Sequence, residues 1–306
     1  MTASTNDIEQ AAGVLRAGGL VALPTETVYG LGANAEDSAA VLRIFQVKGR
    51  PPSHPLIVHI GSAEQLDDWV QDVPATARLL AEHFWPGPLT LVLRRGPRVP
   101  LEATGGLETV AVRVPDHPVA LALLAAFGGG ITAPSANRFG QVSPTTANDV
   151  RTEFGDAIDF VLDGGPCEVG VESTIVDATS DTPTILRPGG VTREDLEAVL
   201  GCPLAVPTAS PVRVPGQHPS HYAPRAQVVL VEPEKVVAEA ETAQGLGHQV
   251  GVFLPASLAD TPVKAHAVVA VPASPAAYAQ GLYGFLRELD HQGCDLIVAS
   301  LPTEEG

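Results

Sequence analysis

Lysine and cysteine are both scarce in this chain, with three of each among 306 residues. The cysteines Cys167, Cys202 and Cys294 lie far apart and form no Cys-x-x-Cys pair. This spacing excludes a cysteine zinc site and offers no disulfide framework. Because a chain without disulfides suits a reducing compartment, we expect a cytoplasmic protein.

Long apolar runs and a basic surface are also missing. No run reaches the roughly 18 apolar residues that a membrane span needs, and the first residues lack the basic and apolar regions of a signal peptide. The formal net charge is −17, from 18 Lys and Arg against 35 Asp and Glu. Such a charge repels phosphate backbones and anionic lipids, so we expect no membrane association and no strong nucleic-acid binding.

Apolar residues make up 45% of the chain, which is ample for a buried core, and the length suits two domains at roughly 100 to 200 residues each. Hydrophobic periodicity predicts strands at 19–24, 56–60, 89–93, 110–114, 131–133, 160–162, 174–177 and 185–186, and helices at 7–17, 37–47, 63–70, 75–84, 119–127 and from Thr192. Six prolines in 202–226 predict a semi-rigid linker. Strands alternate with helices again after it, which predicts a small and mostly parallel sheet. We therefore expect an α/β domain at 1–206, a linker at 207–226 and a second domain at 227–306.

Lys48 is the only lysine before residue 206, where arginine occurs twelve times. A compact ammonium group suits a phosphate or a small anion in a way that a planar guanidinium does not. Lys48 stands in Lys48-Gly49-Arg50-Pro51, at the end of the predicted helix 37–47, so two cations would leave the helix on one turn. These cations could simply complement the helix C-terminus, but the scarcity of lysine favours an anion site.

Two hydroxyl-rich segments follow predicted strands. They are PTETVYGLG, residues 24–32, and TAPSAN, residues 132–137, with Ser143 a little further on. Polar groups at strand ends are the usual site position in open α/β sheets, although turn chemistry or a helix cap would also explain them. The chain has no complete dinucleotide fingerprint and no phosphate-binding GxxxxGK[ST], and the lack of a GxSxG elbow disfavours a hydrolase nucleophile.

Arg113 and Arg187 are flanked by residues that we expect to be buried. A buried arginine usually has an anionic partner. For either arginine alone, an internal carboxylate is the favoured partner and a ligand is the alternative. His59, in LIVHI, fits a core histidine better than a ligand. The residues by themselves thus predict a cationic, hydroxyl-rich site for a phosphorylated ligand, without naming a reaction.

Taken together, the motifs resemble a known family. PTETVYGLG, KGRP with HPLIVHI, APSAN with FGQVSPT, VESTIVD and ILRPGG occur in the order found in the YrdC-like domain of threonylcarbamoyl-AMP synthases, and the similarity covers residues 8 to 201. The remainder resembles the long form of the family, in which a linker ending in a HYAP motif, here residues 221–224, precedes a further domain. The resemblance implies an α/β fold with a YrdC-like twisted open mixed sheet, a proline-rich linker and a small Rossmann-like C-terminal domain.

The function that the resemblance implies is synthesis of L-threonylcarbamoyladenylate from L-threonine, bicarbonate or CO2, and ATP, with release of pyrophosphate. This is a nucleotidyltransferase reaction that serves the threonylcarbamoyladenosine modification of tRNA. Mg²⁺ would enter with ATP, and no resident metal is expected. A downstream complex that transfers the product to tRNA is the implied partner. The alternative is a non-catalytic, RNA-binding role associated with translation, which the negative charge disfavours.

The resemblance also assigns residues. Lys48 and Arg50 would be catalytic. The residues implied for L-threonine are Thr27, His59, Arg113, Ala133 and Ser173. Those implied for ATP are Lys48, Arg50, His54, Thr109, Ser135, Asn137, Ser143 and Arg187. His221 and Tyr222 would form a lid that keeps water from the hydrolysable product.

Overall fold

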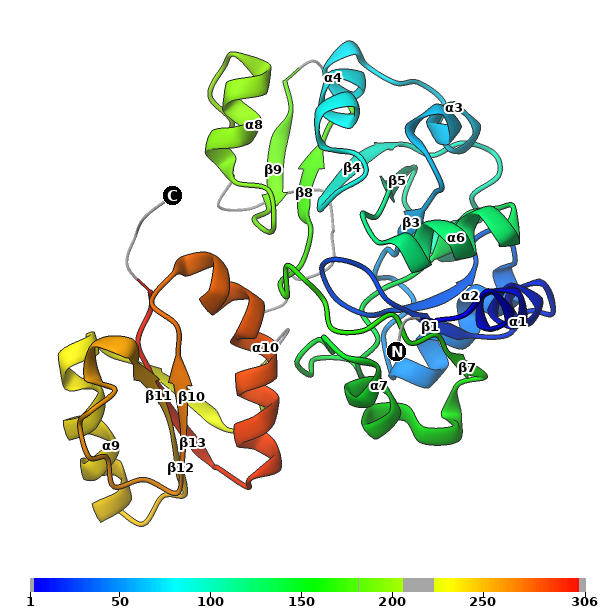
Figure 1. Ribbon diagram of the computed structural model, residues 1–306. Helices are drawn as coiled ribbons and strands as arrows, with labels where there is room; N and C mark the ends of the chain where they lie inside the picture. Colours follow the sequence, from blue (N-terminus) through cyan, green and yellow to red (C-terminus); the bar gives the residue numbers. More distant parts are fainter. Residues whose placement is uncertain (1–2, 181, 206–222, 303–306) are drawn as a thin grey trace. The chain divides into compact units, whose positions relative to one another are not determined.

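The computed structural model describes residues 3–180, 182–205 and 223–302 (Figure 1). Its contacts divide the chain into two units. The first takes in the described residues up to Phe139 and those from Ser143 to 205, and the second takes in Gly140–Val142 and the described residues from 223 onward. Within the described ranges, every helix is too short or too polar to cross a lipid bilayer.

The first unit is built on a mixed sheet, which has nine strands within the described residues and the order β7-β1-β2-β6-β3-β5-β4-β8-β9. The strands are β1 Val21–Leu23, β2 Gly30–Asn34, β3 Ile57–His59, β4 Leu89–Arg94, β5 Thr109–Arg113, β6 Ile131–Thr132, β7 Phe160–Val161, β8 Thr174–Asp177 and β9 Thr184–Arg187. β1 runs parallel to β7, β3 to β5 and β4 to β8, and the other neighbours are antiparallel. The open mixed sheet implied by the family resemblance is confirmed.

Short helices connect these strands. They are α1 Thr5–Arg16, α2 Ser38–Lys48, α3 Leu66–Trp69, α4 Ala75–Phe84, α5 Leu101–Thr104, α6 Pro118–Phe127, α7 Ala147–Phe154 and α8 Arg193–Leu200, with 3-10 turns at Ala63–Gln65 and Gly155–Ala157. The side chain of Thr192 accepts a hydrogen bond from the N–H of Asp195 and caps α8, as the spacing predicts. α2 ends at Gly49, whose φ of +63° is the left-handed conformation that glycine adopts without strain.

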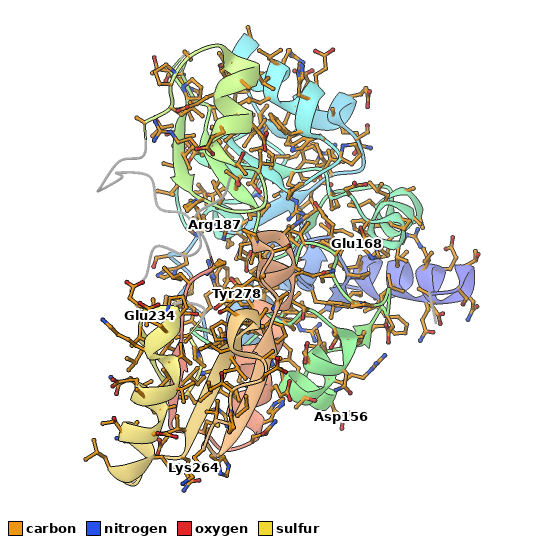
Figure 2. All side chains as sticks on the ribbon, turned by 60° about the vertical axis from the view of Figure 1, so that its left-hand side comes forward. Asp156, Glu168, Arg187, Glu234, Lys264 and Tyr278 are labelled. Carbon is orange, nitrogen blue, oxygen red and sulfur yellow. The ribbon has the colours of Figure 1, made fainter. Side chains whose placement is uncertain are left out.

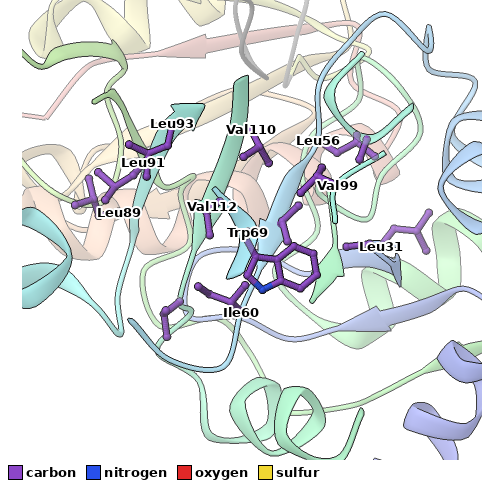
Figure 3. Packing of buried hydrophobic residues seen from close by; sticks show 14 of the residues in the cluster. Leu31, Leu56, Ile60, Trp69, Leu89, Leu91, Leu93, Val99, Val110 and Val112 are labelled. Carbon is purple, nitrogen blue, oxygen red and sulfur yellow. The ribbon is translucent and has the colours of Figure 1, made fainter. Parts of the chain in front are cut away.

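The two faces of the large sheet carry separate hydrophobic cores. β4 directs Leu89, Leu91 and Leu93 into the larger core, and β5 adds Val110 and Val112 (Figure 3). On the other face, α1 and α6 pack over β1 and β6 in a smaller core. Because successive side chains of a strand point to opposite faces, the residues between those core leucines and valines face away from the larger core.

The second unit is a parallel sheet with helices on both faces. Its strands are β10 Gln227–Leu230, β11 Val250–Pro255, β12 Ala267–Val271 and β13 Leu296–Ala299, which within the described residues have the order β10-β13-β11-β12. α9 Val236–Gly245 and α10 Pro275–His291 lie on opposite faces (Figure 1), and 3-10 turns occupy Pro233–Lys235 and Ala256–Leu258. All three strand pairs are parallel, which confirms the small Rossmann-like sheet.

β2, α5 and α7 are absent from the elements that the sequence predicts. Gly30 and Gly32 suggested a turn, but both belong to β2. A Cβ on Gly32 would lie 2.7 Å from a methyl group of Leu23 and 2.8 Å from one of Ile131. These glycines therefore allow close packing of the strand, and the turn itself ends before them.

Candidate active site

Strand alternation gathers predicted site residues on one face of the large sheet. The face opposite the larger core carries His59 on β3 and both Thr109 and Arg113 on β5. A small apolar cluster on the same strands, made by Ile57, Val92, Ala111 and Ile175, lies between them. The sheet thus provides an apolar floor with polar groups around it, which is typical of a small-molecule site.

Arg113 is buried and held by three groups. Its Nη2 forms an ion pair with Glu26, its Nη1 donates to Thr27 Oγ1 at 2.9 Å, and its Nε donates to the Gly87 carbonyl at 3.1 Å. The second carboxylate oxygen of Glu26 accepts the N–H of Asp116 at 3.0 Å. The internal carboxylate expected for a buried arginine is therefore present. The described residues use three of the five guanidinium N–H groups, which leaves one on each Nη for a ligand.

His59 lies beside Arg113, since the two residues are register partners of β3 and β5. Burial is the main factor that lowers the pKa of His59 to about 3, and the positive charge of Arg113 adds to the effect. The imidazole is therefore neutral near pH 7. Among the described residues, nothing hydrogen-bonds to its Nδ1. Ala133 follows β6 on the other side of β3, where its N–H donates to the Ile57 carbonyl at 2.9 Å.

Lys48 ends α2 and reaches across to the loop after β6. Its ammonium donates to the carbonyl oxygens of Ser135, at 2.5 Å, and Asn137. The side chain is buried, and its pKa is held well below the ordinary value by burial and then by the charge of Arg50, while Glu172 opposes the shift. The Lys-x-Arg and Ser-x-Asn motifs, far apart in sequence, therefore meet through this one side chain.

Phe139 brings the next two predicted residues together. The Arg50 guanidinium lies 5.9 Å from the centre of the Phe139 ring, and the His54 ring meets the same phenyl ring edge-on with centroids 5.4 Å apart. Arg50 Nη2 also donates to the Pro55 carbonyl at 3.1 Å. Phe139 is itself tied to α2, because its N–H donates to the Lys48 carbonyl at 2.8 Å.

A second carboxylate, that of the partly buried Glu172, connects the remaining residues. It accepts the Ser143 hydroxyl at 2.8 Å and lies 3.6 Å from Arg187 Nη2. Arg187, labelled in Figure 2, donates through the same Nη2 to the Ser173 carbonyl and hydroxyl oxygens at 2.8 and 3.0 Å. The Ser173 hydroxyl lies 2.9 Å from that of Thr90. Glu172 thus joins Ser143, Arg187 and the start of β8.

The structure therefore sorts the predicted residues into three groups. Thr27, His59, Arg113 and Ala133 lie around β3, β5 and β6; Lys48, Arg50, His54, Ser135 and Asn137 lie around the C-terminal end of α2; Ser143, Ser173 and Arg187 surround Glu172. Thr109 shares the sheet face of Arg113 but lies at the other end of β5. His221 and Tyr222 fall outside the described residues.

Sequence reasoning overlooked Glu26 and Glu172. Both stand inside motifs that the sequence analysis names, TETVYG and VESTIVD. The signal that could have found them is the rule that a buried arginine needs a carboxylate. Within the described ranges, no three His, Cys, Asp or Glu side chains come close enough together to hold a metal ion.

Comparison with known proteins places the chain. Residues 13–189 match the family Sua5_yciO_yrdC, described as telomere recombination, and residues 191–306 match the family described as threonylcarbamoyl-AMP synthase, C-terminal domain. The chain is 43% identical to the threonylcarbamoyl-AMP synthase of Pyrococcus abyssi over 98% of its own length and 90% of that protein. The chain belongs to the threonylcarbamoyl-AMP synthase family.

The chain is also similar to another curated relative and to solved structures. The Bacillus subtilis protein is 44% identical, with 99% of this chain and 90% of that protein covered. The crystal structure of P. abyssi Sua5 complexed with L-threonine superposes with a TM-score of 0.93 at 42% identity, covering 99% of this chain and 91% of that one. The shorter YciO of E. coli aligns with 63% of this chain and 94% of its own, with a TM-score of 0.55 at 26% identity.

Proposed function

We propose that this chain is a threonylcarbamoyl-AMP synthase, an enzyme that joins L-threonine, bicarbonate or CO2, and ATP into L-threonylcarbamoyladenylate and pyrophosphate. The reaction is a nucleotidyl transfer, because the carbamate displaces pyrophosphate from the α-phosphorus of ATP. The observation that carries the proposal is Arg113, a buried guanidinium with two N–H groups left for a ligand, beside Thr27 and His59 on one face of the sheet. The product serves tRNA modification, and a downstream transfer complex is the partner we expect.

On the threonine side, Arg113 binds the substrate carboxylate. A guanidinium offers two parallel N–H groups that match the two oxygens of a carboxylate. Glu26 and Gly87 hold Arg113 in place before the substrate arrives, so less conformational entropy is lost on binding. His59 is neutral and places no second charge beside Arg113. Thr27, Ala133 and Ser173 complete the threonine-binding set carried over from the family.

On the ATP side, the charges around α2 and Glu172 receive the triphosphate. Lys48 fixes the Ser135–Asn137 loop through two carbonyls, and Arg50 and Arg187 supply guanidinium groups. His54, Thr109 and Ser143 complete the ATP-binding set. We propose that Mg²⁺ arrives bound to the phosphates of ATP, because Mg²⁺ usually binds through substrate phosphates and one or two carboxylates.

The chemistry needs positioning and charge more than a protein nucleophile. The amine of L-threonine attacks the carbon of CO2 and loses a proton, which gives a carbamate. A carbamate oxygen then attacks the α-phosphorus in line, and the bond to the pyrophosphate oxygen breaks. Lys48, Arg50 and Arg187 would stabilise negative charge on the phosphate oxygens during this transfer, so that no triad or cysteine is required.

The deciding experiment is a mass-spectrometric search for L-threonylcarbamoyladenylate, with pyrophosphate release measured in parallel. The mixture contains the protein, ATP, Mg²⁺, L-threonine and bicarbonate, and each component is omitted in turn. We expect product that requires every substrate and that falls to background in Lys48→Ala. Background levels in the wild-type protein, with ATP binding retained, would move the RNA-binding alternative to the front. That alternative is then tested by the retention of labelled RNA on filters.

The lid remains a proposal, since its residues lie outside the described ranges. A lid acts on product lifetime, because threonylcarbamoyl-AMP is readily hydrolysed. We expect His221→Ala with Tyr222→Ala to lower product yield per pyrophosphate released by several-fold. An unchanged ratio of product to pyrophosphate would remove the lid role.

A further inference from the structure

The turn between β1 and β2 contains a chain of hydroxyl groups. Thr25 Oγ1 lies 2.8 Å from Thr27 Oγ1 and 2.6 Å from the carbonyl oxygen of Val28. The same Thr25 oxygen accepts the backbone N–H groups of Thr27 and Val28, each at 3.2 Å. Arg113 Nη1 lies 2.9 Å from Thr27 Oγ1. Both threonines are buried, so bulk water does not enter this chain.

The chemistry of these groups leaves one direction for every hydrogen bond. A carbonyl oxygen only accepts, so the single hydroxyl hydrogen of Thr25 goes to Val28. Thr25 then has no hydrogen left for Thr27, so Thr27 donates the 2.8 Å contact between the two hydroxyls. The two longer N–H contacts, each at 3.2 Å, share the other lone pair of Thr25 Oγ1. A guanidinium only donates, so Arg113 gives its hydrogen to Thr27. The hydrogen bonds therefore run from Arg113 to Thr27, to Thr25 and to Val28.

This direction restricts what Thr27 can offer to a substrate. Its hydrogen is bound to Thr25, and one of its two lone pairs is bound to Arg113. One lone pair remains, so a ligand that reaches Thr27 finds an acceptor and no donor. Since Thr27 and its neighbours are buried, the ligand meets this group only after the atoms that cover it have moved.

An acceptor at this position suits an amine that must act as a nucleophile. The nitrogen of L-threonine attacks carbon through its lone pair, so that lone pair must stay free. An acceptor binds an N–H of the amine and leaves the lone pair free. A hydroxyl able to donate would instead bind the nitrogen lone pair and compete with the carbon electrophile.

We propose that Thr25 is a positioning residue that holds the Thr27 hydroxyl as an acceptor only, so that the substrate amine is bound through N–H with its lone pair available. This inference rests on the proposed function and deepens it at the threonine side. Thr25 itself does not touch the substrate. Its effect passes through Thr27, so it should depend on whether the Thr27 hydroxyl is present.

A double-mutant cycle tests that dependence. Thr25→Val, Thr27→Val and the double variant are compared with wild type by kcat/KM for L-threonine at saturating ATP and bicarbonate. We expect Thr25→Val to lower this value about tenfold, with the KM for ATP changed by less than twofold, and Thr25→Ser to restore it to within about threefold. The double variant should be no worse than Thr27→Val, because no hydroxyl is left to orient.

Thr25 also supports the turn, so melting temperatures of all variants accompany the kinetics. If Thr25→Val does not fold, Thr25→Ala replaces it in the same cycle. Losses that multiply in the double variant would overturn the proposal, since a purely structural role acts whether or not Thr27 carries a hydroxyl. L-Threonine binding is measured by calorimetry without ATP in the same set. Absence of product from wild type would count against the proposed function, whereas multiplied losses of threonine affinity would count against the role of Thr25.

Discussion

The ammonium of Lys48 donates to the carbonyl oxygen of Ser135 at 2.5 Å, which binds the last residue of α2 to the loop after β6. This contact joins the two sequence motifs that we assign to ATP binding in the proposed function. It also explains why a lysine stands here in a domain otherwise rich in arginine. A compact ammonium donates to two converging carbonyls that a planar fork does not match.

Removal of Lys48 should affect both stability and ATP binding. Lys48→Ala leaves the Ser135 and Asn137 carbonyls without this hydrogen-bond donor. Each carbonyl that stays buried without a new partner lowers the free energy of unfolding by roughly 1–3 kcal/mol. We expect a clear fall in melting temperature and at least a tenfold rise in the Kd for ATP measured by calorimetry, with Lys48→Arg only partly restoring the affinity. Arg43→Ala is the matched control on the same helix, since its ion pair with Asp159 is about two-fifths exposed (42% and 41%). A melting temperature that changes equally in both variants would contradict this role for Lys48.

Replacement of Glu26 should weaken L-threonine binding. Glu26→Gln removes the charge that pairs with Arg113, and its amide nitrogen cannot accept the N–H of Asp116 as the carboxylate does. A buried ion pair that loses one partner typically costs 3–5 kcal/mol. We expect a strong drop in the free energy of unfolding by urea and a KM for L-threonine that rises about tenfold, with a smaller change for ATP.

Glu36→Gln provides the comparison for Glu26→Gln. Glu36 pairs with Arg98, but both side chains are well exposed, so this pair contributes little. The expected change in unfolding free energy is below about 1 kcal/mol. If Glu26→Gln proves as mild as this control, Arg113 does not depend on the carboxylate for its position.

His59 should make the protein sensitive to mild acid. In the folded chain its pKa is lowered to about 3, whereas an unfolded histidine titrates near 6.5. Between these values the unfolded chain binds a proton that the folded chain does not. The stability due to the neutral imidazole is therefore fully present above pH 6.5 and is lost as the pH falls toward 3, by at most about 1.4 kcal/mol for each pH unit.

The check on His59 is urea unfolding at several pH values between 7 and 4. His59→Gln should lose stability less steeply than wild type as the pH falls. His291→Gln, at the exposed C-terminal end of α10, should keep the wild-type slope. Parallel slopes for wild type and His59→Gln would show that other groups account for the acid sensitivity.

Gly189 should tolerate no side chain. A Cβ there would lie 2.3 Å from the Glu172 carbonyl oxygen and 2.5 Å from the Ser173 carbonyl carbon. Because the clash involves backbone, Gly189→Ala must displace the segment that carries Glu172, and we expect a lower melting temperature together with a higher KM for ATP. Gly13→Ala is the control, since its Cβ meets nothing within 4 Å inside α1 and alanine favours the helix by up to about 1 kcal/mol. If Gly189→Ala leaves the melting temperature and the KM for ATP unchanged, the loop after β9 can shift at little cost in free energy.

Much of the fold followed from hydrophobic pattern. The strand at 174–177 and the helix at 75–84 occur in the structure with the predicted bounds, because each has a strong pattern with clear ends. β2 could not be predicted in the same way. Its glycines match a turn in sequence, and only the closeness of Leu23 and Ile131 to Gly32 shows why a strand needs them.

The sequence predicts which residues belong to the site, but it does not predict which of them contact one another. The motifs named Lys48, Arg113 and Arg187 as cations, and burial was expected for the two arginines. That Lys48 would bind loop carbonyls while Glu26 holds Arg113 depends on which loops the sheet order brings together. A single sequence carries no such long-range information, so the hydrogen-bond and ion-pair partners of these residues had to come from the structure.

The uneven placement of lysine gives this protein a built-in chemical reporter. Amine-reactive reagents will label Lys235 and Lys264, which are exposed in the second unit, while Lys48 is shielded by burial. Labelling at Lys48, read by peptide mass mapping, therefore records only those moments when the first unit opens around α2. The same sample reports the second unit through its other two amines, so the opening of each unit can be followed separately without introducing a probe.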